Sequence, residues 1–565
     1  KDNGDFEMGK QRLSKHWFSV ILVVVLFLFN DLSSQIIDTI QSYQPSAYSI
    51  ATGSVGKLLT YLSNNWLTYG LTLIGYFFVW MMLIVIVVTG MLLTWGLASR
   101  QHFLIGLKSL QIHLAVFVMV LLFIPLNQVG FKFPIAYYLT IPKTFIDPIM
   151  TPVMLVIIGF VNIGSLLLAY RLRLVPYFAI TTRQNLKINV TYSWQQTKFQ
   201  TGQFLLTIGK YALMTIAVIG GFFWLQRLFD QFLNTGLNRS MVNILIAIAI
   251  GYFYFVTSQV LLLFITKDQQ IAHTRLQDKK LYLRIIQVII IGLVGASSSL
   301  LSGKFVSHPI KNYVVIAHKG VSSESDASNT IISLNKVSKT KPDYVEIDIQ
   351  ATSDGVYVLS HDDKIKAKNG KTYQINETPW HILKKLRYEE NGKIITATPF
   401  IAYIKRANQL NQKLLVELKI NTTITTTQLV HFQKKYGAYL TENRAQLQSM
   451  NQNAIKRLAK YSDRPIGLLS PVVNSVNYAK FNTFYAMEYS NVNTNIARQV
   501  IKKHKTLYVW TLNKEADINS NYALGVQGYI TDYPKETREI LQKLSRHAVY
   551  ADAMWYIVML QKTAV

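Results

Sequence analysis

Two carboxylates and a histidine interrupt apolar stretches in the second half of this chain. Glu346 and Asp348 lie two residues apart in the stretch 344–349, and His361 ends the stretch 356–361. Side chains alternate between the two faces of a strand, so the two carboxylates point the same way. Such a pair near a core repels and loses hydration, and a cation between the two groups removes both costs. Oxygen ligands of this kind suit Mg²⁺ or Ca²⁺.

A third carboxylate and a second histidine also lie at or near the ends of apolar stretches. Glu417 lies near the end of the stretch 414–419, and His318 ends the stretch 313–318. Alone, a carboxylate or histidine at such a position is more often structural. Three carboxylates near strand ends favour a divalent-cation site, and His318 and His361 are then a candidate general acid and base.

Positive and polar side chains accompany these groups. Lys319 directly follows His318, and Lys419 lies two residues after Glu417. Ammonium groups at these points suit a bound phosphate. Asn329 is a candidate polar contact to the same substrate, with capping of its own loop as an equal alternative.

Nine short apolar stretches would position these residues. Polar, amphipathic stretches separate most of them, which indicates a parallel sheet with crossover helices. Nine is close to the eight strands of a closed α/β barrel, where the carboxyl ends of all strands form one face. We predict such a TIM-type barrel, with one stretch as an edge piece or no strand. The stretches are 313–318, 344–349, 356–361, 414–419, 447–450, 466–470, 484–490, 507–513 and 528–534.

The connection between the second and third stretches fits this barrel poorly. Only residues 350–355 separate them, and Asp354-Gly355 is typical of a hairpin turn. Parallel neighbours normally need a longer crossover. Six extended residues span roughly 20 Å, so we expect the chain to return outside the barrel without a helix.

The first 300 residues hold seven stretches long and apolar enough to cross a bilayer. Sixteen Lys and Arg residues fall on one side of these spans and five on the other, which predicts a cytoplasmic N-terminus and an extracellular barrel. The first stretch is read as an uncleaved anchor. The predicted spans are 17–33, 69–96, 113–130, 149–170, 206–226, 241–266 and 284–302.

The expected organisation therefore has four parts. A cytoplasmic segment 1–16 precedes a helical membrane domain 17–303, and the barrel occupies 304–545. A short apolar helix at 546–565 is too short to span, and is either interfacial, docked on the barrel or a packed terminal helix. The predicted spans lack central charges, which argues against an ion-coupled transporter and leaves an anchor or a lipid vestibule.

The composition indicates which classes of binding partner to expect. The chain has 565 residues, no cysteine and a net charge of +28. Without cysteine, disulfides and thiolate sites are excluded. The charge fits anionic partners such as membrane lipids or a polyanionic polymer, with a generally basic protein as an equal alternative. No basic stripe interleaved with aromatics stands out, so nucleic acid is not expected. The oligomeric state stays open.

Eight short motifs in the second half resemble the glycerophosphodiester phosphodiesterase family in order and spacing. They cover about 230 residues, and the first half resembles the membrane domain of some bacterial members. Each motif is weak alone, but eight in register are strong. The motifs are AHKG (317–320), SNT (328–330), EID (346–348), SDG (353–355), HD (361–362), ELK (417–419), WTLN (510–513) and GYITDYP (528–534).

The resemblance implies a phospholipase-C-like barrel that releases sn-glycerol 3-phosphate. In the mechanism that the resemblance implies, a glycerol hydroxyl attacks phosphorus, and water then opens the cyclic product. The roles that it implies are acid and base for His318 and His361, cation ligands for Glu346, Asp348 and Glu417, phosphate or carboxylate contact for Lys419, and an alcohol-side wall or core packing for Trp510.

Two positions depart from the family pattern. The family usually has Arg where this chain has Lys319, and Glu where it has Ser328. Lys keeps the charge but loses bidentate phosphate binding. We expect an active, metal-dependent hydrolase at the outer membrane face. Its expected substrates are a lipoteichoic-acid-like polymer of a Gram-positive envelope, phosphatidylglycerol or a deacylated phospholipid. A non-catalytic polymer-binding scaffold and a phospholipase-D-like lyase remain the alternatives.

Overall fold

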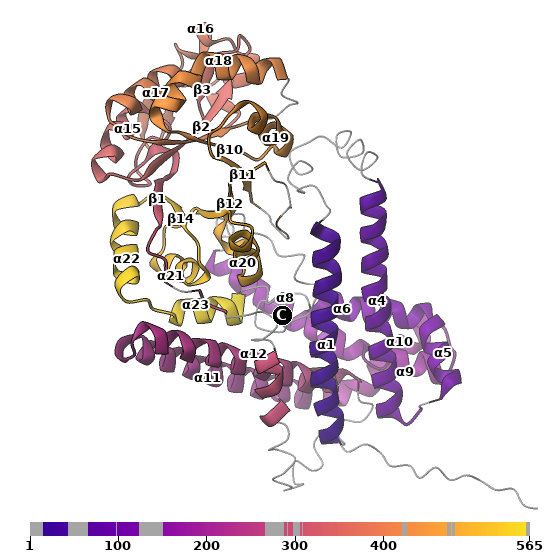
Figure 1. Cartoon of the computed structure of the whole chain (residues 1–565). Coiled ribbons are helices and arrows are strands. Elements are labelled where there is room, and N and C mark those ends of the chain that lie inside the picture. Colours follow the sequence, from indigo (N-terminus) through magenta and orange to yellow (C-terminus); the bar gives the residue numbers. More distant parts are fainter. Residues whose placement is uncertain are drawn as a thin grey trace, which may run out of the picture.

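The computed structural model describes residues 15–42, 66–97, 99–123, 151–265, 288–290, 292–297, 305–307, 309–420, 426–471, 476 and 481–560. Residues outside these ranges include parts of the predicted third and seventh spans. The described chain forms a helical N-terminal part and a C-terminal α/β barrel (Figure 1).

Eight parallel strands form the barrel. Each pairs in parallel with the next around the ring, which closes because β1 pairs with both β14 and β2. This confirms the predicted fold class. The strands are β1 (Val314–Ala317), β2 (Tyr344–Ala351), β9 (Leu414–Leu418), β10 (Gln446–Ser449), β11 (Ile466–Ser470), β12 (Phe484–Glu488), β13 (Thr506–Trp510) and β14 (Gly528–Thr531).

The prediction for the third apolar stretch was wrong. Its strand, β3 (Tyr357–Leu359), pairs antiparallel with the last residues of β2 and is not part of the ring. The intervening turn closes as a hairpin at Gly355, whose φ of +77° suits glycine. So short a connection cannot return the chain to the other end of a parallel neighbour. A second antiparallel strand, β8 (Thr398–Pro399), extends this edge.

Residues 361–397, between β3 and β8, form a separate small lobe. Its own core contains Ile365, Ala367, Ile375 and Leu383. The lobe consists of two antiparallel hairpins and a short helix: β4 (Lys364–Lys366), β5 (Thr372–Gln374), α16 (Trp380–Leu383), β6 (Arg387–Glu390) and β7 (Lys393–Thr396).

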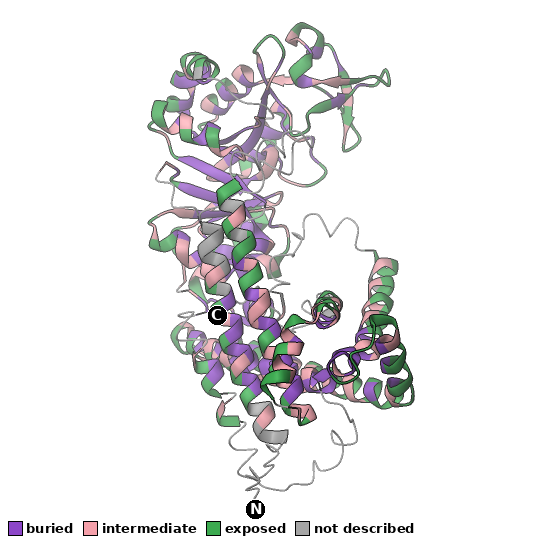
Figure 2. Ribbon diagram, turned by 90° about the vertical axis from the view of Figure 1, so that its right-hand side faces the viewer, coloured by how far each residue is buried: buried purple, intermediate pink, exposed green. Residues whose placement is uncertain are grey.

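Helices cover the outside of the ring, and three of them start at side-chain caps. Thr330, Asn451 and Asn493 each accept a backbone hydrogen bond at a helix start. The strands are almost entirely buried, whereas the helices present exposed outer faces (Figure 2). The helices are α15 (Ile331–Val337), α17 (Phe400–Gln409), α18 (Thr426–Asn443), α19 (Gln452–Tyr461), α20 (Thr494–Lys502), α21 (Glu515–Leu524) and α22 (Pro534–Arg546).

Apolar side chains fill the barrel interior opposite the polar residues of β2. Ile316, Phe484, Tyr508 and Ile530 belong to this cluster. A Cβ atom at Gly528 would lie 2.1 Å from the ring of Tyr508, so the start of β14 needs glycine for this close approach. The packed interior leaves the carboxyl ends of the strands as the face where polar side chains gather.

The N-terminal part consists of helices of varied length. Among the described residues, four helices are long and apolar enough to span a membrane, or five if the pair α5–α6, bent by 67°, forms one span. Residues 21–33 and 288–297 give shorter apolar helices. Helices thus occur at all seven predicted spans where the structure describes them, but the count of seven and the orientation stay predictions. The helices are α1 (Lys15–Ser42), α4 (Trp66–Trp95), α5 (Arg100–Lys108), α6 (Leu110–Phe123), α8 (Pro152–Leu172), α9 (Val175–Thr181), α10 (Leu186–Thr197), α11 (Thr201–Phe232) and α12 (Thr235–Ile265).

The C-terminal segment joins the two parts. Helix α23 (Ala551–Trp555) packs against α21 of the barrel and against α11 and α12 (Figure 1). Asp230 of α11 accepts the backbone N–H groups of Tyr550 and Ala551 at 2.9 and 3.0 Å, and also a hydrogen bond from Asn238. The apolar tail is thus docked on the barrel, and it also contacts α11 and α12 of the N-terminal part.

Candidate metal-dependent active site

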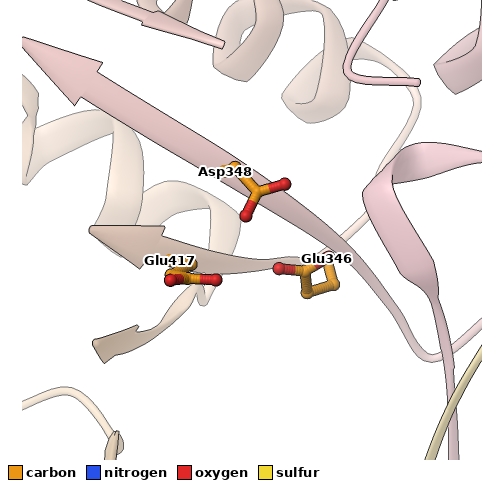
Figure 3. A group of neighbouring side chains, drawn as sticks. All are labelled: Glu346, Asp348 and Glu417. Atoms are coloured by element: carbon orange, nitrogen blue, oxygen red, sulfur yellow. The ribbon is translucent and has the colours of Figure 1, made fainter. Parts of the chain in front are cut away.

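Three carboxylates converge at the carboxyl ends of two neighbouring strands (Figure 3). Glu346 and Asp348 extend from β2 and Glu417 from β9, and the strand register places Asp348 directly beside Glu417. One oxygen from each of the three lies within 4.8 Å of the others. All three residues are at most 4% exposed. The predicted ligand set is therefore assembled in one buried place.

Hydrogen bonds and one lysine hold the cluster. Lys419 Nζ lies 3.2 Å from Asp348 Oδ1 and 3.4 Å from Glu417 Oε1. The side-chain amide of Asn329 donates to Asp348 Oδ2 at 3.1 Å, and its oxygen accepts the Asp348 N–H. The backbone N–H of Lys319 donates to Glu346 Oε2 at 2.9 Å. The carboxylates are thus held in fixed orientations.

The three carboxyl groups of the cluster have different pKa values because they are buried close together. Burial raises the pKa of Glu346 well above its usual value, and the charges of Asp348 and Glu417 add to this. Burial also raises the pKa of Glu417 to about 8, although Lys419 opposes the shift. Burial would raise the pKa of Asp348 too, but Lys419 and His361 outweigh it and hold that pKa low. One ammonium therefore does not neutralise the whole cluster.

A divalent cation fits this donor set. The three ligands are hard oxygen donors on rigid strands, as Mg²⁺ and Ca²⁺ prefer. A fourth oxygen, Gln448 Oε1, is buried and has no hydrogen-bond partner among the described residues. Its amide nitrogen lies 3.5 Å from Glu346 Oε1, which places the side chain at the edge of the cluster. A bound cation would balance the excess negative charge.

His318 is held by an acidic partner that the sequence analysis did not single out. Its Nδ1 lies 2.8 Å from Asp532 Oδ1, and the side chain is 22% exposed. Asn513 donates to Asp532 Oδ2 at 2.6 Å, and its oxygen accepts the Asp532 N–H. Burial would raise the pKa of Asp532, but the hydrogen bond to His318 lowers it. Both partners lie inside quoted motifs, and their places just after β13 and β14, beside β1, were the available signal.

His361 lies on the exposed rim, at the start of the lobe. Its Nδ1 is 2.8 Å from Asp362 Oδ1. Loss of hydration lowers the pKa of His361, and Lys419 adds to this while Asp348 opposes it. His361 also lowers the pKa of Asp348, so the two groups interact. The predicted second histidine is therefore electrostatically coupled to the carboxylate cluster.

The four predicted substrate-binding residues differ in their surroundings. Lys419 touches two of the carboxylates, and Lys319 touches the third through its backbone. Asn329 is engaged with Asp348, so it positions that carboxylate. Trp510 packs against the barrel interior, and its buried Nε1 has no partner among the described residues. Their direct contact with substrate stays a prediction.

The lobe supplies a contact that the sequence did not indicate. Glu390 of β6 accepts hydrogen bonds from the Ser328 N–H, at 3.1 Å, and from the Ser328 hydroxyl. Asn391 donates to the backbone oxygens of Glu324 and Asp326, both at 2.8 Å. The lobe thus clamps the loop that carries Asn329. This pairing joins residues 62 apart, and no local pattern marks it.

Comparison with known proteins decides the family of the barrel. Residues 318–536 match the model of the glycerophosphoryl diester phosphodiesterase family. This barrel is a glycerophosphoryl diester phosphodiesterase family domain. The match begins at His318 and ends just after Asp532, so it contains every residue of the site described above.

Individual relatives agree with the family. A glycerophosphodiester phosphodiesterase of Caldanaerobacter subterraneus is 25% identical over 239 residues, which are 41% of this chain and 98% of that protein. The human lysophospholipase D GDPD1 is 22% identical over 275 residues, 41% of this chain and 86% of that protein. The solved structure of an Oleispira antarctica phosphodiesterase in complex with sn-glycerol-3-phosphate matches 41% of this chain and 97% of its own, with 19% identity and a TM-score of 0.36. The resemblance drawn from the eight motifs is confirmed, and the family supports glycerophosphodiester phosphodiesterase activity for the barrel.

Proposed function

We propose that the barrel hydrolyses a glycerol phosphodiester in a cation-dependent reaction and releases glycerol 3-phosphate. The observation that carries this proposal is the convergence of Glu346, Asp348 and Glu417 within 4.8 Å. Both histidines are tied to this cluster. Lys319, next to His318, donates its N–H to Glu346, and His361 interacts with Asp348.

The two histidines are suited to different steps. Asp532 accepts a hydrogen bond at His318 Nδ1, which leaves Nε2 free to take the proton of the attacking glycerol hydroxyl. The pKa of His361 lies below its usual value, so its protonated form readily gives a proton to the leaving alcohol. Water then opens the cyclic phosphate, and the same histidines exchange roles.

The remaining groups stabilise charge and orient the substrate. A cation held by the three carboxylates would polarise the phosphoryl oxygens. Lys419 is buried beside the same carboxylates, where its charge balances both the cluster and an incoming phosphate. Trp510, whose buried Nε1 has no partner among the described residues, is the candidate wall on the alcohol side of the pocket.

The membrane setting belongs to the same proposal. The apolar helices anchor the barrel to a bilayer, the barrel faces the outside, and the substrate is anionic and membrane-bound or wall-bound. Membrane lipids are the expected partners. The net charge of +28 favours a lipoteichoic-acid-like polymer, phosphatidylglycerol or a deacylated phospholipid.

The test is the hydrolysis of glycerophosphodiesters by the full chain in detergent, with Mg²⁺ or Ca²⁺ and after chelation. We expect turnover to require the cation, and to fall about 100-fold or more in His318→Ala. Glu346→Gln should reduce both turnover and cation affinity. Substrate binding without any turnover by the wild-type protein would instead favour the non-catalytic scaffold.

Product analysis separates the remaining enzymatic alternative. The human lysophospholipase D relative, at 22% identity, motivates a lysolipid as a second substrate candidate. A hydrolase ends at glycerol 3-phosphate from a glycerophosphodiester and at lysophosphatidate from a lysolipid, whereas a lyase accumulates the corresponding cyclic phosphate. Chromatography of the products from a glycerophosphodiester and from a lysolipid therefore distinguishes the two reactions.

A further inference from the structure

The lobe presents a row of basic side chains on one face. Lys364, Lys366 and Lys368 alternate with Ile365 and Ala367, which are buried in the lobe core. The three lysines are therefore on the opposite, exposed face. The Cα atoms of Lys364 and Lys366 are about 7 Å apart, because two residues of a strand span that length, and Lys368 follows in the turn after the bridge at Ala367.

A fourth basic residue extends the row. The isolated bridge between Ala367 and Tyr388 places Arg387 directly opposite Lys368, and the Lys368 N–H donates to the Arg387 oxygen at 2.8 Å. Like charges directly opposite each other destabilise a sheet. The salt bridges of the described residues include none to these four side chains, and the same register places Glu389 opposite Lys366 on this face. We call Lys364, Lys366, Lys368 and Arg387 the basic ridge.

The basic ridge is fixed relative to the site. It begins three residues after His361. The side-chain amide of Gln350, on barrel strand β2, donates to the backbone oxygens of Ser360 and Asp362 at 3.0 and 2.9 Å. Glu390 holds the other end of the lobe at Ser328. A ligand bound at the carboxylate cluster and a ligand on the ridge would therefore keep a constant spatial relation.

The position of the lobe favours a polymer over a lipid surface. In Figure 1, α16 of the lobe lies at the end of the barrel remote from α11 and α12, the helices that contact the barrel through α23. A single phosphodiester is matched by the cation site and Lys419, and does not need four further charges. Regularly spaced charges fit a ligand with regularly spaced phosphates.

We propose that the basic ridge binds successive phosphates of a glycerophosphate polymer while one of its diesters lies at the carboxylate cluster. This inference rests on the proposed function. It specifies that the preferred substrate is a polyanionic chain and that the lobe selects it over small diesters. Such an electrostatic surface raises the rate of productive encounter with a polyanion and is weakened by salt.

The experiment compares two substrates in the full-length protein in detergent. One is a synthetic 1,3-poly(glycerol phosphate) oligomer, and the other is glycerophosphoglycerol, which has a single diester. The ridge variant is Lys364→Gln/Lys366→Gln/Lys368→Gln. The matched control, Lys434→Gln/Lys456→Gln/Lys460→Gln, removes the same charge from exposed positions on α18 and α19.

We expect the ridge variant to lose about tenfold in kcat/KM for the oligomer, with less than about a twofold change for glycerophosphoglycerol. The control variant should match the wild type on both substrates. The inference is overturned if the ridge variant matches the wild type on the oligomer, if the control loses as much, or if only binding to phosphatidylglycerol vesicles or single-stranded DNA falls. If the wild-type protein cleaves neither substrate, the proposed function fails, and fluorescence anisotropy of the labelled oligomer still tests the ridge by itself.

Discussion

Cation binding at the carboxylate cluster should release protons. Glu417 has a pKa of about 8, and the pKa of Glu346 is raised well above its usual value. At pH 7 a pKa of 8 leaves the group protonated about nine-tenths of the time. A carboxyl group must ionise to bind a cation, so each bound cation should displace about one proton from Glu417. The affinity for the cation then rises with pH.

The magnitude follows from this proton count. Each displaced proton raises the association constant about tenfold per pH unit below the pKa. Between pH 6 and pH 7 we therefore expect the affinity for Mg²⁺ or Ca²⁺ to rise about tenfold from the Glu417 proton. Stability of the metal-free protein should move in the opposite direction. The folded state keeps the Glu417 proton up to about pH 8, whereas the unfolded state loses it near 4.5, so the free energy of unfolding falls as pH rises through that window.

The assay is isothermal titration calorimetry on chelator-treated full-length protein. Measurements in two buffers with different ionisation enthalpies give the number of protons released. Glu417→Gln should release about one proton fewer and bind the cation more weakly. Heats that do not depend on the buffer, together with an affinity that is constant from pH 6 to pH 8, would refute the electrostatic account of the cluster.

Three further variants test the supporting contacts. Asp532→Asn should lower kcat about 100-fold with little change in KM, because the imidazole of His318 loses the carboxylate that orients it. An unchanged kcat would contradict a role in positioning His318. Glu390→Gln should reduce kcat/KM about tenfold, because the contact between Glu390 and Ser328 is weakened. Combining it with Ser328→Ala should add little, whereas additive losses would show that the two residues act separately. Asp230→Ala should lower the free energy of unfolding in detergent by about 3 kcal/mol, because the N–H groups of Tyr550 and Ala551 lose their acceptor. The control Arg227→Gln, at a side chain 51% exposed, should cost less than about 1 kcal/mol. Equal losses in thermal unfolding would contradict the importance of the buried carboxylate.

The sequence predicted the barrel because its signals are local. Eight of the nine stretches became ring strands. The remaining one, 356–361, became a hairpin strand, as the turn at Asp354-Gly355 indicated. That turn signal was correct, and the expected return of the chain outside the barrel was wrong. The membrane spans were also local signals, but span count and orientation depend on segments outside the described residues.

The ligand carboxylates were predictable for a similar reason. Strand alternation fixed Glu346 and Asp348 on one side, and parallel pairing of β2 with β9 brings Glu417 to the same level. The partners of the site were not predictable in this way. Asp532 lies 214 residues from His318, and Glu390 lies 62 residues from Ser328. Their contacts arise only when the ring closes and the lobe folds back.

The structure also bears on the two departures from the family pattern. At position 319 the contact with the cluster is made by the backbone N–H, which donates to Glu346. A backbone donor does not depend on whether the side chain is Lys or Arg, so this part of the site is preserved. At position 328 the serine holds the Glu390 carboxylate through its N–H and hydroxyl. A carboxylate therefore lies beside residue 328 although the chain has no glutamate there, and the lobe supplies it. Neither departure removes a group that orients the three cation ligands, which is why we expect Lys319→Arg to change phosphate affinity and leave cation affinity unaltered.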